Sequence, residues 1–395
     1  MYMEKIRFGI IGYGTQGKFY SAILTGAELP GIGRIPQPEG CVLSAVSVRR
    51  KEALEQLQQI PGVSYFADWK EMIDSRCCDA IVITTPHYSH REIAVYALEH
   101  GIHVLCDKPA AVQASEVEQM LATARENPGM ALALIHNQRT AEVFRKVKEL
   151  IASGELGQLR RSSWIVNNWW RPDSYYESSS WRGTWAGEGG GVLVNQAPHQ
   201  LDLWLWLCGK PKKIFAKCIE GAHRKITVEN DVTIVAEYEN GATGTFITCT
   251  HDPMGTDRLE LDFSKGKIVV ENSKDATVCR FRQEEEEWNK TLSYPEMAMK
   301  SMRSPQELFE VEKFSGPPQY GIGHGKIFEN FADHLLRGVP LIATGEDGLA
   351  AVQLANAAQL SGWKHQELDF PCDADAYDRF LQQRILGENV SVLLK

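Results

Sequence analysis

The sequence lacks an excess of positive charge. Its 42 lysines and arginines are outnumbered by 51 aspartates and glutamates, so the formal net charge at pH 7 is −9. Nucleic acids and anionic membrane surfaces attract proteins with surplus positive charge. The charge balance therefore argues against both as bulk partners and favours a small molecule as the ligand.

Apolar runs long enough to cross a membrane are missing, and so is any metal-binding cysteine spacing. Runs such as Leu203 to Leu207 are far shorter than the roughly 20 residues that span a bilayer. The nine cysteines include the adjacent Cys77 and Cys78, but no CxxC spacing of a redox couple or structural zinc site. A strand pattern starts within a few residues of Met1, which leaves no room for a signal peptide. We expect a protein of the reducing cytoplasm, without a metal site.

A glycine pattern stands at the start of the chain, whose 395 residues are enough for two domains. An apolar strand, residues 6–12, runs directly into GxGxxG. In a dinucleotide-binding turn these glycines permit a tight bend and a close approach of backbone and helix N-terminus to a pyrophosphate. A purely structural glycine turn is the alternative. The expected cofactor contacts here are Gly12, Gly14, Thr15, Gln16 and Gly17.

The second strand, 42–48, should end near the adenosine ribose. NAD-binding folds usually place an acidic residue there. This chain instead has Ser47, Arg49 and Arg50, which offer a hydroxyl and cations to a 2′-phosphate. The pattern favours NADP over NAD. The alternative is the solvated basic start of a helix, 51–59, which NAD would tolerate.

Strands and helices alternate regularly up to residue 109. Strands are expected at 63–66, 80–85 and 103–109, and helices at 69–74 and 90–100. This order predicts a parallel, doubly wound Rossmann domain over residues 1–130, with the Gly- and Pro-rich stretch 25–40 as a surface excursion. Ligands bind at the carboxyl ends of such strands. The residues expected beside the cofactor there are Thr85, Pro86, His87, His90, Asp107 and Lys108.

Residues 189–202 read GGGVLVNQAPHQLD, a glycine-rich approach to a helix expected over 196–207. Proline is tolerated only in a first helical turn, so Pro198 places His199 at the helix start. Asp202, three residues on, can share the face of His199. The pair is a candidate acid–base site. A core histidine beside the following Leu and Trp residues is the alternative.

A segment rich in aromatic and polar residues, 167–191, precedes that helix. Aromatic faces stack on sugar rings, while Asn, Arg and Tyr bind sugar hydroxyls, so the composition suits a polyol or glycoside pocket. Aromatic packing at a subunit interface is the alternative. A strand at 131–135 ends in further polar residues, expected either at the substrate or at a domain junction. The expected substrate contacts are His136, Arg139, Trp169, Arg171, Tyr175, Trp181, Trp185, Asn195 and His199.

The remaining chain changes to strands joined by short turns. Strands are expected at 160–166, 213–220, 232–240, 243–251, 258–263, 266–272 and 277–283, and late helices at 327–337 and 346–362. The pattern predicts an α+β domain over 131–371 with a large, open, mainly antiparallel sheet. Glu284 to Glu287 fit a solvated acidic loop. The tail, 372–395, is expected to be helix and loop without chemistry.

Four motifs in order, GYGTQG at 12–17, TTPHYSH at 84–90, CDKP at 106–109 and GGGVLVNQAPHQLD, resemble the Gfo/Idh/MocA family of oxidoreductases. The resemblance implies that Lys108 lies beside the nicotinamide and the reacting carbinol, and that His199 is the acid–base residue. It also implies a homodimer or homotetramer that pairs through the faces of the second sheet. The family often has an aspartate four residues before the histidine, where this chain has Asn195. Orientation of His199 would then pass to the substrate, to Asp202 or to a water molecule.

The sequence therefore predicts an NAD(P)-dependent oxidoreductase that moves hydride between a secondary alcohol of a sugar, glycoside or cyclic polyol and nicotinamide. Lys108, Asn195 and His199 are its expected catalytic residues. One alternative is a lyase or hydrolase that oxidises sugar C3 transiently and recycles its bound cofactor. Another is a cofactor or sugar sensor without catalysis, for which the motivation is Asn195 in place of an acid.

Overall fold

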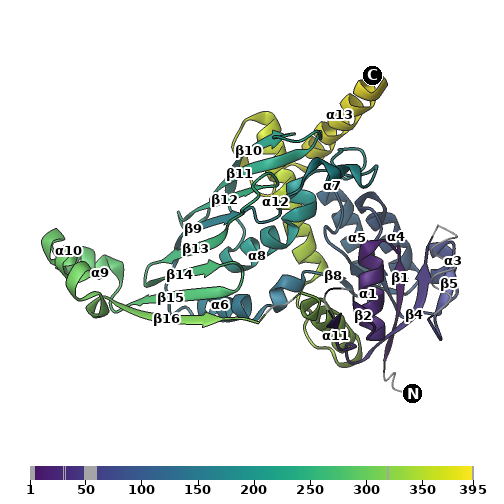
Figure 1. Ribbon diagram of the computed structural model, residues 1–395, viewed down its shortest axis with the longest axis horizontal. Helices are drawn as coiled ribbons and strands as arrows, with labels where there is room; N and C mark the ends of the chain where they lie inside the picture. The colour runs from purple at the N-terminus through teal and green to yellow at the C-terminus, as the bar shows by residue number, and fades with distance from the viewer. Residues whose placement is uncertain (1–4, 30, 32, 49–59, 318–319, 394–395) are drawn as a thin grey trace.

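The computed structural model describes residues 5–29, 31, 33–48, 60–317 and 320–393. Six parallel strands form the first sheet, in the order β5-β4-β1-β6-β7-β8 (Figure 1). The strands are β1 (Ile6–Ile11), β4 (Cys41–Ser47), β5 (Ser64–Phe66), β6 (Ala80–Ile83), β7 (His103–Cys106) and β8 (Leu132–Leu134). Every residue of β6 is buried, as expected for a sheet that helices cover on both faces. The predicted Rossmann fold is confirmed.

The helices of this part follow the predicted alternation. They are α1 (Thr15–Thr25), α3 (Trp69–Asp74), α4 (His90–Glu99) and α5 (Ala114–Glu126). The helix expected over 51–59 lies outside the described residues. The excursion at 25–40 contains a small hairpin, β2 (Glu28–Leu29) with β3 (Gly33–Arg34). β8 lies just past the predicted domain boundary at residue 130, yet it pairs with β7 as the edge strand of this sheet.

The second sheet has nine strands in the order β16-β15-β14-β13-β9-β12-β11-β10-β17. All pairs are antiparallel except β9 with β12, so the predicted open, mainly antiparallel sheet is confirmed. The strands are β9 (Leu159–Val166), β10 (Lys213–Glu220), β11 (Glu229–Glu237), β12 (Thr243–Cys249), β13 (Asp257–Phe263), β14 (Gly266–Glu271), β15 (Asp275–Phe281), β16 (Phe309–Ser315) and β17 (Leu368–Asp369).

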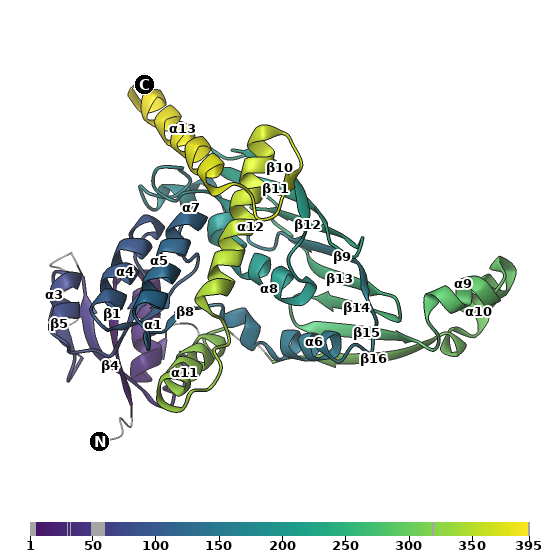
Figure 2. The ribbon, with the colours of Figure 1, turned by 180° about the vertical axis from the view of Figure 1, so that it is seen from behind.

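Helices cover one face of the second sheet and leave the other face uncovered (Figure 2). The covering helices are α6 (Glu142–Ala152), α8 (Pro198–Cys208) and α12 (Gly345–Lys364). Their apolar residues share one core with the inward residues of the strands, which include Trp164 and Phe246. The alternation of buried and exposed residues along β11 and β13 follows from this one-sided burial.

The chain returns to the first domain near its end. Helix α11 (Ile322–Arg337) packs on the Rossmann sheet, where Phe328 meets the ring of Phe8 edge-on at 5.4 Å. Helix α12 contacts β8 at its start and β10 further along, so it crosses from one sheet to the other. Both predicted late helices are confirmed, and they join the two sheets.

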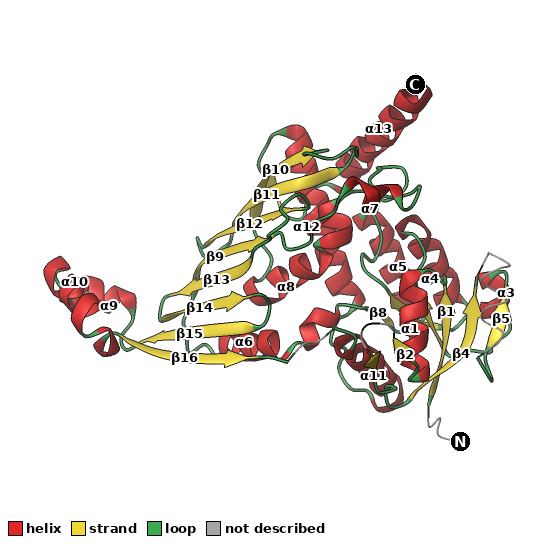
Figure 3. Cartoon of the chain, viewed as in Figure 1, coloured by secondary structure: helices red, strands yellow, loops and turns green. Residues whose placement is uncertain are grey.

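The acidic stretch at 284–287 is not the loop that was expected. Glu284 precedes helix α9 (Glu285–Thr291), which is followed by α10 (Tyr294–Arg303) in an arm that projects from the sheet (Figure 3). Carboxylates in a first turn are stabilised by the helix dipole. They are also ion-paired here: Glu284 with Lys265, and Glu286 with Arg160. Partners that are distant in the sequence, such as Arg160, thus help to make a helix of a run that looks like a solvated loop in the sequence.

The tail is mostly one helix, α13 (Ala374–Leu393), which projects away from the body (Figure 1). The first turns of α13 are fixed to α12, because the hydroxyl of the buried Tyr377 donates to Gln359 at 2.7 Å. Among the described residues, none of the helices is both long and apolar enough to cross a membrane, and no cluster of His, Cys, Asp or Glu could hold a metal ion.

Candidate functional site

The glycine turn has the shape that a dinucleotide pyrophosphate requires. Gly12 has φ +96°, which favours glycine, and a Cβ on Gly17 would lie 2.2 Å from the carbonyl oxygen of Gly12. Gly14 caps α1 without a side-chain hydrogen bond, and a Cβ there would meet none of the described residues within 4 Å. Thr15 and Gln16 begin the helix. Free backbone N–H groups and open space at a helix N-terminus fit a bound phosphate. The turn therefore fits the predicted cofactor.

The ribose end of the cofactor site is described only in part. The amide of Gly12 donates to the carbonyl of Ser47 at 3.1 Å, so the end of β4 lies beside the glycine turn. Ser47 itself is buried. Arg49 and Arg50, the expected 2′-phosphate contacts, lie outside the described residues. The preference for NADP stays a prediction.

Two residues expected at the cofactor are engaged within the protein instead. Both ring nitrogens of the buried His90 contact carbonyl oxygens, Thr85 at 2.8 Å and Pro109 at 3.0 Å. His90 therefore joins the loops after β6 and β7 and has no nitrogen left for a ligand. The carboxylate of Asp107 accepts from the Tyr20 hydroxyl at 3.1 Å and from its neighbour's backbone N–H at 2.9 Å. These groups hold the loop that carries Lys108.

Lys108 and the segment before His199 meet across the two domains. The Nζ of Lys108 donates to the backbone carbonyl of Asn195 at 2.7 Å. Asn195 lies in a π-helical turn, Val192–Gln196, that leads directly into α8. Burial lowers the pKa of Lys108, while the nearby Asp107 opposes that shift. The contact brings together two residues that are 87 positions apart in the chain.

His199 is held as a neutral imidazole. Burial lowers its pKa well below the usual value, and the ammonium of Lys108 lowers it further, as would a proton on His136 or His324. Its Nδ1 is enclosed and has no hydrogen-bond partner among the residues that the structure describes. A neutral imidazole near a lysine ammonium can accept a proton from an alcohol. The expected position of His199 at the helix start agrees with α8, in which Pro198 is the first residue.

Asp202 does not orient His199. Its two oxygens accept from Arg139 at 2.8 and 2.6 Å, a bidentate pair in which both side chains are buried. Arg139 also contacts Asp347 at 3.0 Å and donates to the carbonyl of Ile342 at 3.1 Å. The guanidinium is fully engaged at the junction with α12, so Arg139 is structural and not the substrate contact that was expected.

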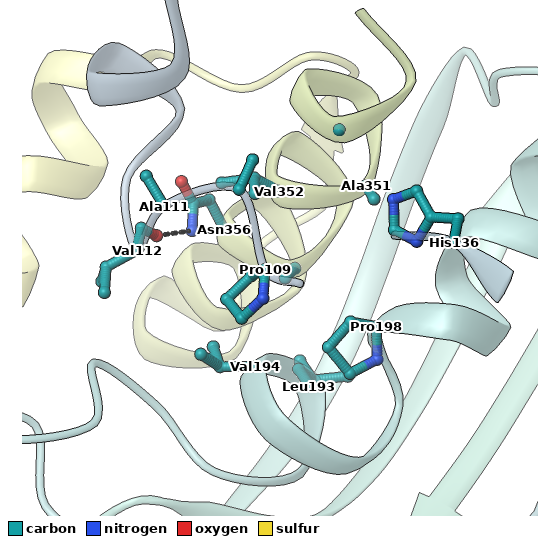
Figure 4. A pocket seen from close by; sticks show the side chains of 13 residues that line it. Pro109, Ala111, Val112, His136, Leu193, Val194, Pro198, Ala351, Val352 and Asn356 are labelled. Atoms are coloured by element: carbon teal, nitrogen blue, oxygen red, sulfur yellow. Dashed lines mark hydrogen bonds between the residues drawn. The ribbon is translucent and has the colours of Figure 1, made fainter. Parts of the chain in front are cut away.

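His136 lies at the domain junction and not with the aromatic segment. It is buried, and it lines a small, mainly apolar cavity with Pro109 and Pro198 (Figure 4). Its Nε2 is 3.7 Å from Asp202, too far for a hydrogen bond. Its ring centre is 6.0 Å from that of His199. His136 is therefore a neighbour of His199, close enough for a proton on His136 to affect the pKa of His199.

Several residues of the aromatic segment gather around Asn195. The Tyr175 hydroxyl accepts from Arg182 at 2.6 Å and contacts the side-chain amides of Asn195 at 3.4 Å and Gln196 at 3.3 Å. The guanidinium of Arg171 lies 4.8 Å from the centre of the Tyr175 ring. These partly buried groups provide both donors and aromatic faces next to the Lys108 contact.

The three tryptophans expected in the pocket have different surroundings. Trp181 is partly exposed. The guanidinium carbon of Arg182 lies 4.4 Å from the centre of its ring, and the ring of His87 meets it edge-on with the ring centres 5.7 Å apart. Trp169 packs against the core of the second sheet. Trp185 is only 2% exposed; its Nε1 donates to the carbonyl of Thr227, and its ring packs on Trp363. Trp185 is therefore a core residue, and only Trp181 stays beside the polar group.

Two residues of the site were not foreseen. Glu188 is 1% exposed and contacts the side-chain amide of Asn195. Its signal in the sequence was a single acid inside the glycine run GEGGG. His324 comes from α11 and is buried against Phe19, which it meets at 5.0 Å. Burial lowers its pKa to about 4, so it is neutral beside Lys108. No local pattern marks His324, because only the return of α11 to the first domain brings it there.

The glycine turn, the lysine after β7 and the histidine of α8 define an oxidoreductase of the NAD-binding, two-domain kind. Residues 6–134 match the oxidoreductase family with an NAD-binding Rossmann fold, and residues 144–269 match the GFO/IDH/MocA C-terminal domain. The chain belongs to the Gfo/Idh/MocA family, as its motifs predicted.

Similar proteins cover nearly the whole chain. Myo-inositol 2-dehydrogenase of Thermotoga maritima is 22% identical over 90% of this chain and 96% of its own length. The NADP(+)-dependent scyllo-inositol 2-dehydrogenase IolW of Bacillus subtilis is 22% identical over 91% and 94%. A structure of levoglucosan dehydrogenase in complex with NADH and levoglucosan matches with a TM-score of 0.75 at 20% identity, over 93% of this chain and 100% of that chain. At this identity the structural match concerns the fold.

Proposed function

We propose that this protein is an NAD(P)-dependent dehydrogenase that acts on a secondary alcohol of a sugar, glycoside or cyclic polyol. The observation that carries the proposal is the contact of Lys108 with Asn195, four residues before the neutral His199, beside a polar aromatic group. Relatives named as inositol and levoglucosan dehydrogenases support the substrate class. A cytoplasmic location is part of the same proposal.

His199 takes the proton of the substrate hydroxyl. Its Nδ1 is enclosed by the protein, so Nε2 is the nitrogen that receives the proton. Lys108 stabilises the negative charge that develops on the same oxygen. The bound nicotinamide supplies the acceptor for the hydride that leaves the carbinol carbon. The substrate thus loses one proton and one hydride and becomes a ketone, and in the reverse direction His199 returns the proton.

The groups around Asn195 select a polyhydroxylated substrate. Tyr175, Arg182 and Asn195 offer donors and acceptors for hydroxyls other than the reacting one, and Trp181 offers a face to the apolar side of a ring. A site built to hydrogen-bond hydroxyls rejects analogues that lack them, because its polar groups are then left unpaired. We expect poor activity with simple aliphatic alcohols for this reason.

The nucleotide choice is the finer part of the proposal. Ser47, Arg49 and Arg50 at the end of the second strand favour the 2′-phosphate of NADP. The charge pattern is what supports this choice of nucleotide. The relatives do not decide it, because one has NADP(+) in its name and a structure of another contains NADH. NADP is therefore the proposed cofactor, with NAD as the alternative.

A substrate panel tests the function. The protein is purified, any bound nucleotide is released and identified, and inositols, free sugars, anhydrosugars and glycosides are each assayed with NAD and with NADP. We expect the ultraviolet absorbance of reduced nicotinamide to rise with at least one polyhydroxylated ring compound. Release of an aglycone without net reduction would instead identify cleavage with a recycled cofactor. Nucleotide and sugar binding without turnover of any compound would identify a sensor.

We also propose that the uncovered face of the second sheet pairs with a second copy of the chain. Phe215 and Val235 are directly opposed on neighbouring strands there, and they are 42% and 44% exposed. Further apolar residues on the strands, Ile165 and Ile219, are each 38% exposed. Apolar patches of this kind on a sheet usually mark an interface.

The pairing predicts a specific change of mass. The wild-type protein should have at least twice the chain mass of 44.3 kDa by light scattering, and Val235→Glu should lower it to that of one chain. A charge at the centre of an apolar interface is left without water or a partner. Val339→Glu is the control, since Val339 is also partly exposed, at 37%, but lies outside the sheet. A wild-type protein with the mass of one chain would exclude the proposal.

A further inference from the structure

Asn195 is held by a buried carboxylate. Glu188 is 1% exposed, and its Oε1 accepts a hydrogen bond from Nδ2 of Asn195. Its Oε2 accepts from the backbone N–H of Gly183 at 2.6 Å. Among the described residues a cation also lies close, Arg182, whose Nη1 is 4.0 Å from Oε1. A buried carboxylate is tolerated only where such donors satisfy it, so each of these contacts is needed.

The carboxylate determines which way the amide of Asn195 faces. An ionised carboxylate only accepts hydrogen bonds, so the NH2 group of Asn195 must face Glu188 and its Oδ1 must face away. The Tyr175 hydroxyl is a second partner of the NH2 group, at 3.4 Å. Within the described residues no donor bonds to Oδ1. The orientation therefore presents an acceptor oxygen in the site, free for a hydroxyl of a ligand.

The same carboxylate lies close to the charge on Lys108. Lys108 donates to the backbone carbonyl of Asn195, the residue whose side chain bonds Glu188. Glu188 favours the charged form of the lysine and opposes the effect of burial on the pKa of Lys108. Burial raises the pKa of Glu188, but its hydrogen bonds and the charges of Arg182 and Lys108 oppose that shift. The negative charge of this part of the site thus comes from residue 188, while residue 195 supplies a neutral amide.

The two positions are mutually constrained. An aspartate at 195 would put a second carboxylate against Glu188 at contact distance, and two buried carboxylates that close are not both ionised. A glutamine at 188 would have one oxygen and one NH2 group for two partners that both donate, Gly183 and Asn195. The first change therefore forces one carboxyl of the pair to take up a proton, and the second leaves one of the two donors facing an NH2 group.

We propose that Glu188 is a positioning residue that acts through Asn195, and that the two form a matched acid–amide pair that orients Asn195 Oδ1 toward a substrate hydroxyl. The pair is exchangeable only as a unit. With glutamine at 188 and aspartate at 195, the glutamine oxygen accepts from Gly183 and its NH2 group donates to the aspartate. One carboxylate and one amide are then present again, with both hydrogen bonds of residue 188 in place. This role rests on the proposed dehydrogenase function.

The test is a double-mutant cycle with Glu188→Gln, Asn195→Asp and the double variant. We expect each single variant to lose about 100-fold in kcat/KM for the best sugar or polyol of the panel, and the double variant to recover to within about 10-fold of wild type. The acidic limb of the kcat/KM profile should move to higher pH in Asn195→Asp alone, because its two carboxylates share a proton. Glu177→Gln, an exposed acid on the same segment, is the control for loss of a carboxylate.

A second measurement separates this proposal from the function on which it rests. Thermal unfolding without ligand should show the same pattern, with each single variant lower in Tm by about 2–4 °C and the double variant close to wild type. Additive losses in the double variant, in Tm or in kcat/KM, would refute the matched pair. A wild-type protein that turns over no sugar or polyol would overturn the proposed function and with it the positioning role, whereas the Tm pattern would still decide whether the pair exists.

Discussion

His199→Asn is expected to reduce kcat by about 1,000-fold while the affinity for the nucleotide stays the same. Removal of a general acid–base residue costs about 10²–10⁴ in rate. His199 lies on α8 of the second domain, whereas the glycine turn lies at the start of α1, so the nucleotide contacts are not altered. Steady-state kinetics with the best substrate of the panel, together with fluorescence titration of the reduced nucleotide, measure both quantities.

The matched control for this variant is His365→Asn. His365 is an exposed residue that ends α12 with φ 52°, a conformation that asparagine adopts readily. It should retain wild-type turnover. A His199→Asn protein that keeps more than about a tenth of the wild-type kcat would contradict the acid–base role, given the usual size of that effect. Loss of nucleotide binding in this variant would contradict the separation of the two sites.

The pH dependence of oxidation follows from the same histidine. Burial lowers the pKa of His199 well below its usual value of about 6.5, so the neutral, proton-accepting form persists as the pH falls through 6.5. The acidic limb of kcat/KM that belongs to His199 should therefore lie below that value. A limb at or above the usual imidazole pKa, absent in His199→Asn, would show that the histidine is more solvated than its surroundings indicate.

Lys108→Met is expected to lower kcat by about 100- to 1,000-fold, the usual cost of removing one group that stabilises a developing oxyanion. Methionine keeps much of the length of the side chain but removes the ammonium. The hydrogen bond to the carbonyl of Asn195 is lost with it. Because the glycine turn is unchanged, the nucleotide should still bind, as the same fluorescence titration measures.

The stability of this variant distinguishes a catalytic lysine from a structural one. Lys108 is partly buried, and burial of an ammonium opposes folding unless its partners compensate fully. Replacement by an apolar side chain of similar size should therefore leave Tm unchanged or raise it while turnover falls. A marked drop in Tm would mean that the bond to Asn195 mainly holds the two domains together. Lys108→Arg, which keeps the charge with a different geometry, should retain part of the activity.

Most of the fold was predictable because its signals are local. The strand before Gly12, the alternating strands and helices of the first domain and the short turns of the second sheet depend on residues that are neighbours in the chain. The helices α9 and α10 were missed because acids such as Glu286 become a helical first turn only with partners such as Arg160, 126 positions away. Without that partner the same run fits a solvated loop.

The site was predictable only in part, for a related reason. Motifs identified Lys108, Asn195 and His199, and the structure brings the first two into contact. Residue type could not reveal that Arg139 is committed to Asp202, because that pair joins two segments 63 positions apart. Trp185 was expected in the pocket because of the composition of the segment around it, but its packing on Trp363 places it in the core.

The sequence by itself determined the nucleotide-binding fold, the open second sheet, the family and the histidine at the start of a helix. These features follow from periodicity, glycine spacing and the one backbone angle that proline permits, all of which act over a few residues. The tertiary structure alone decided which charges meet: Asp202 with Arg139, and Glu188 with Asn195. Which charged groups pair depends on their distance in space, and breaking a buried pair costs folding free energy. The missing acid at position 195 is for this reason understood only beside the buried acid at 188.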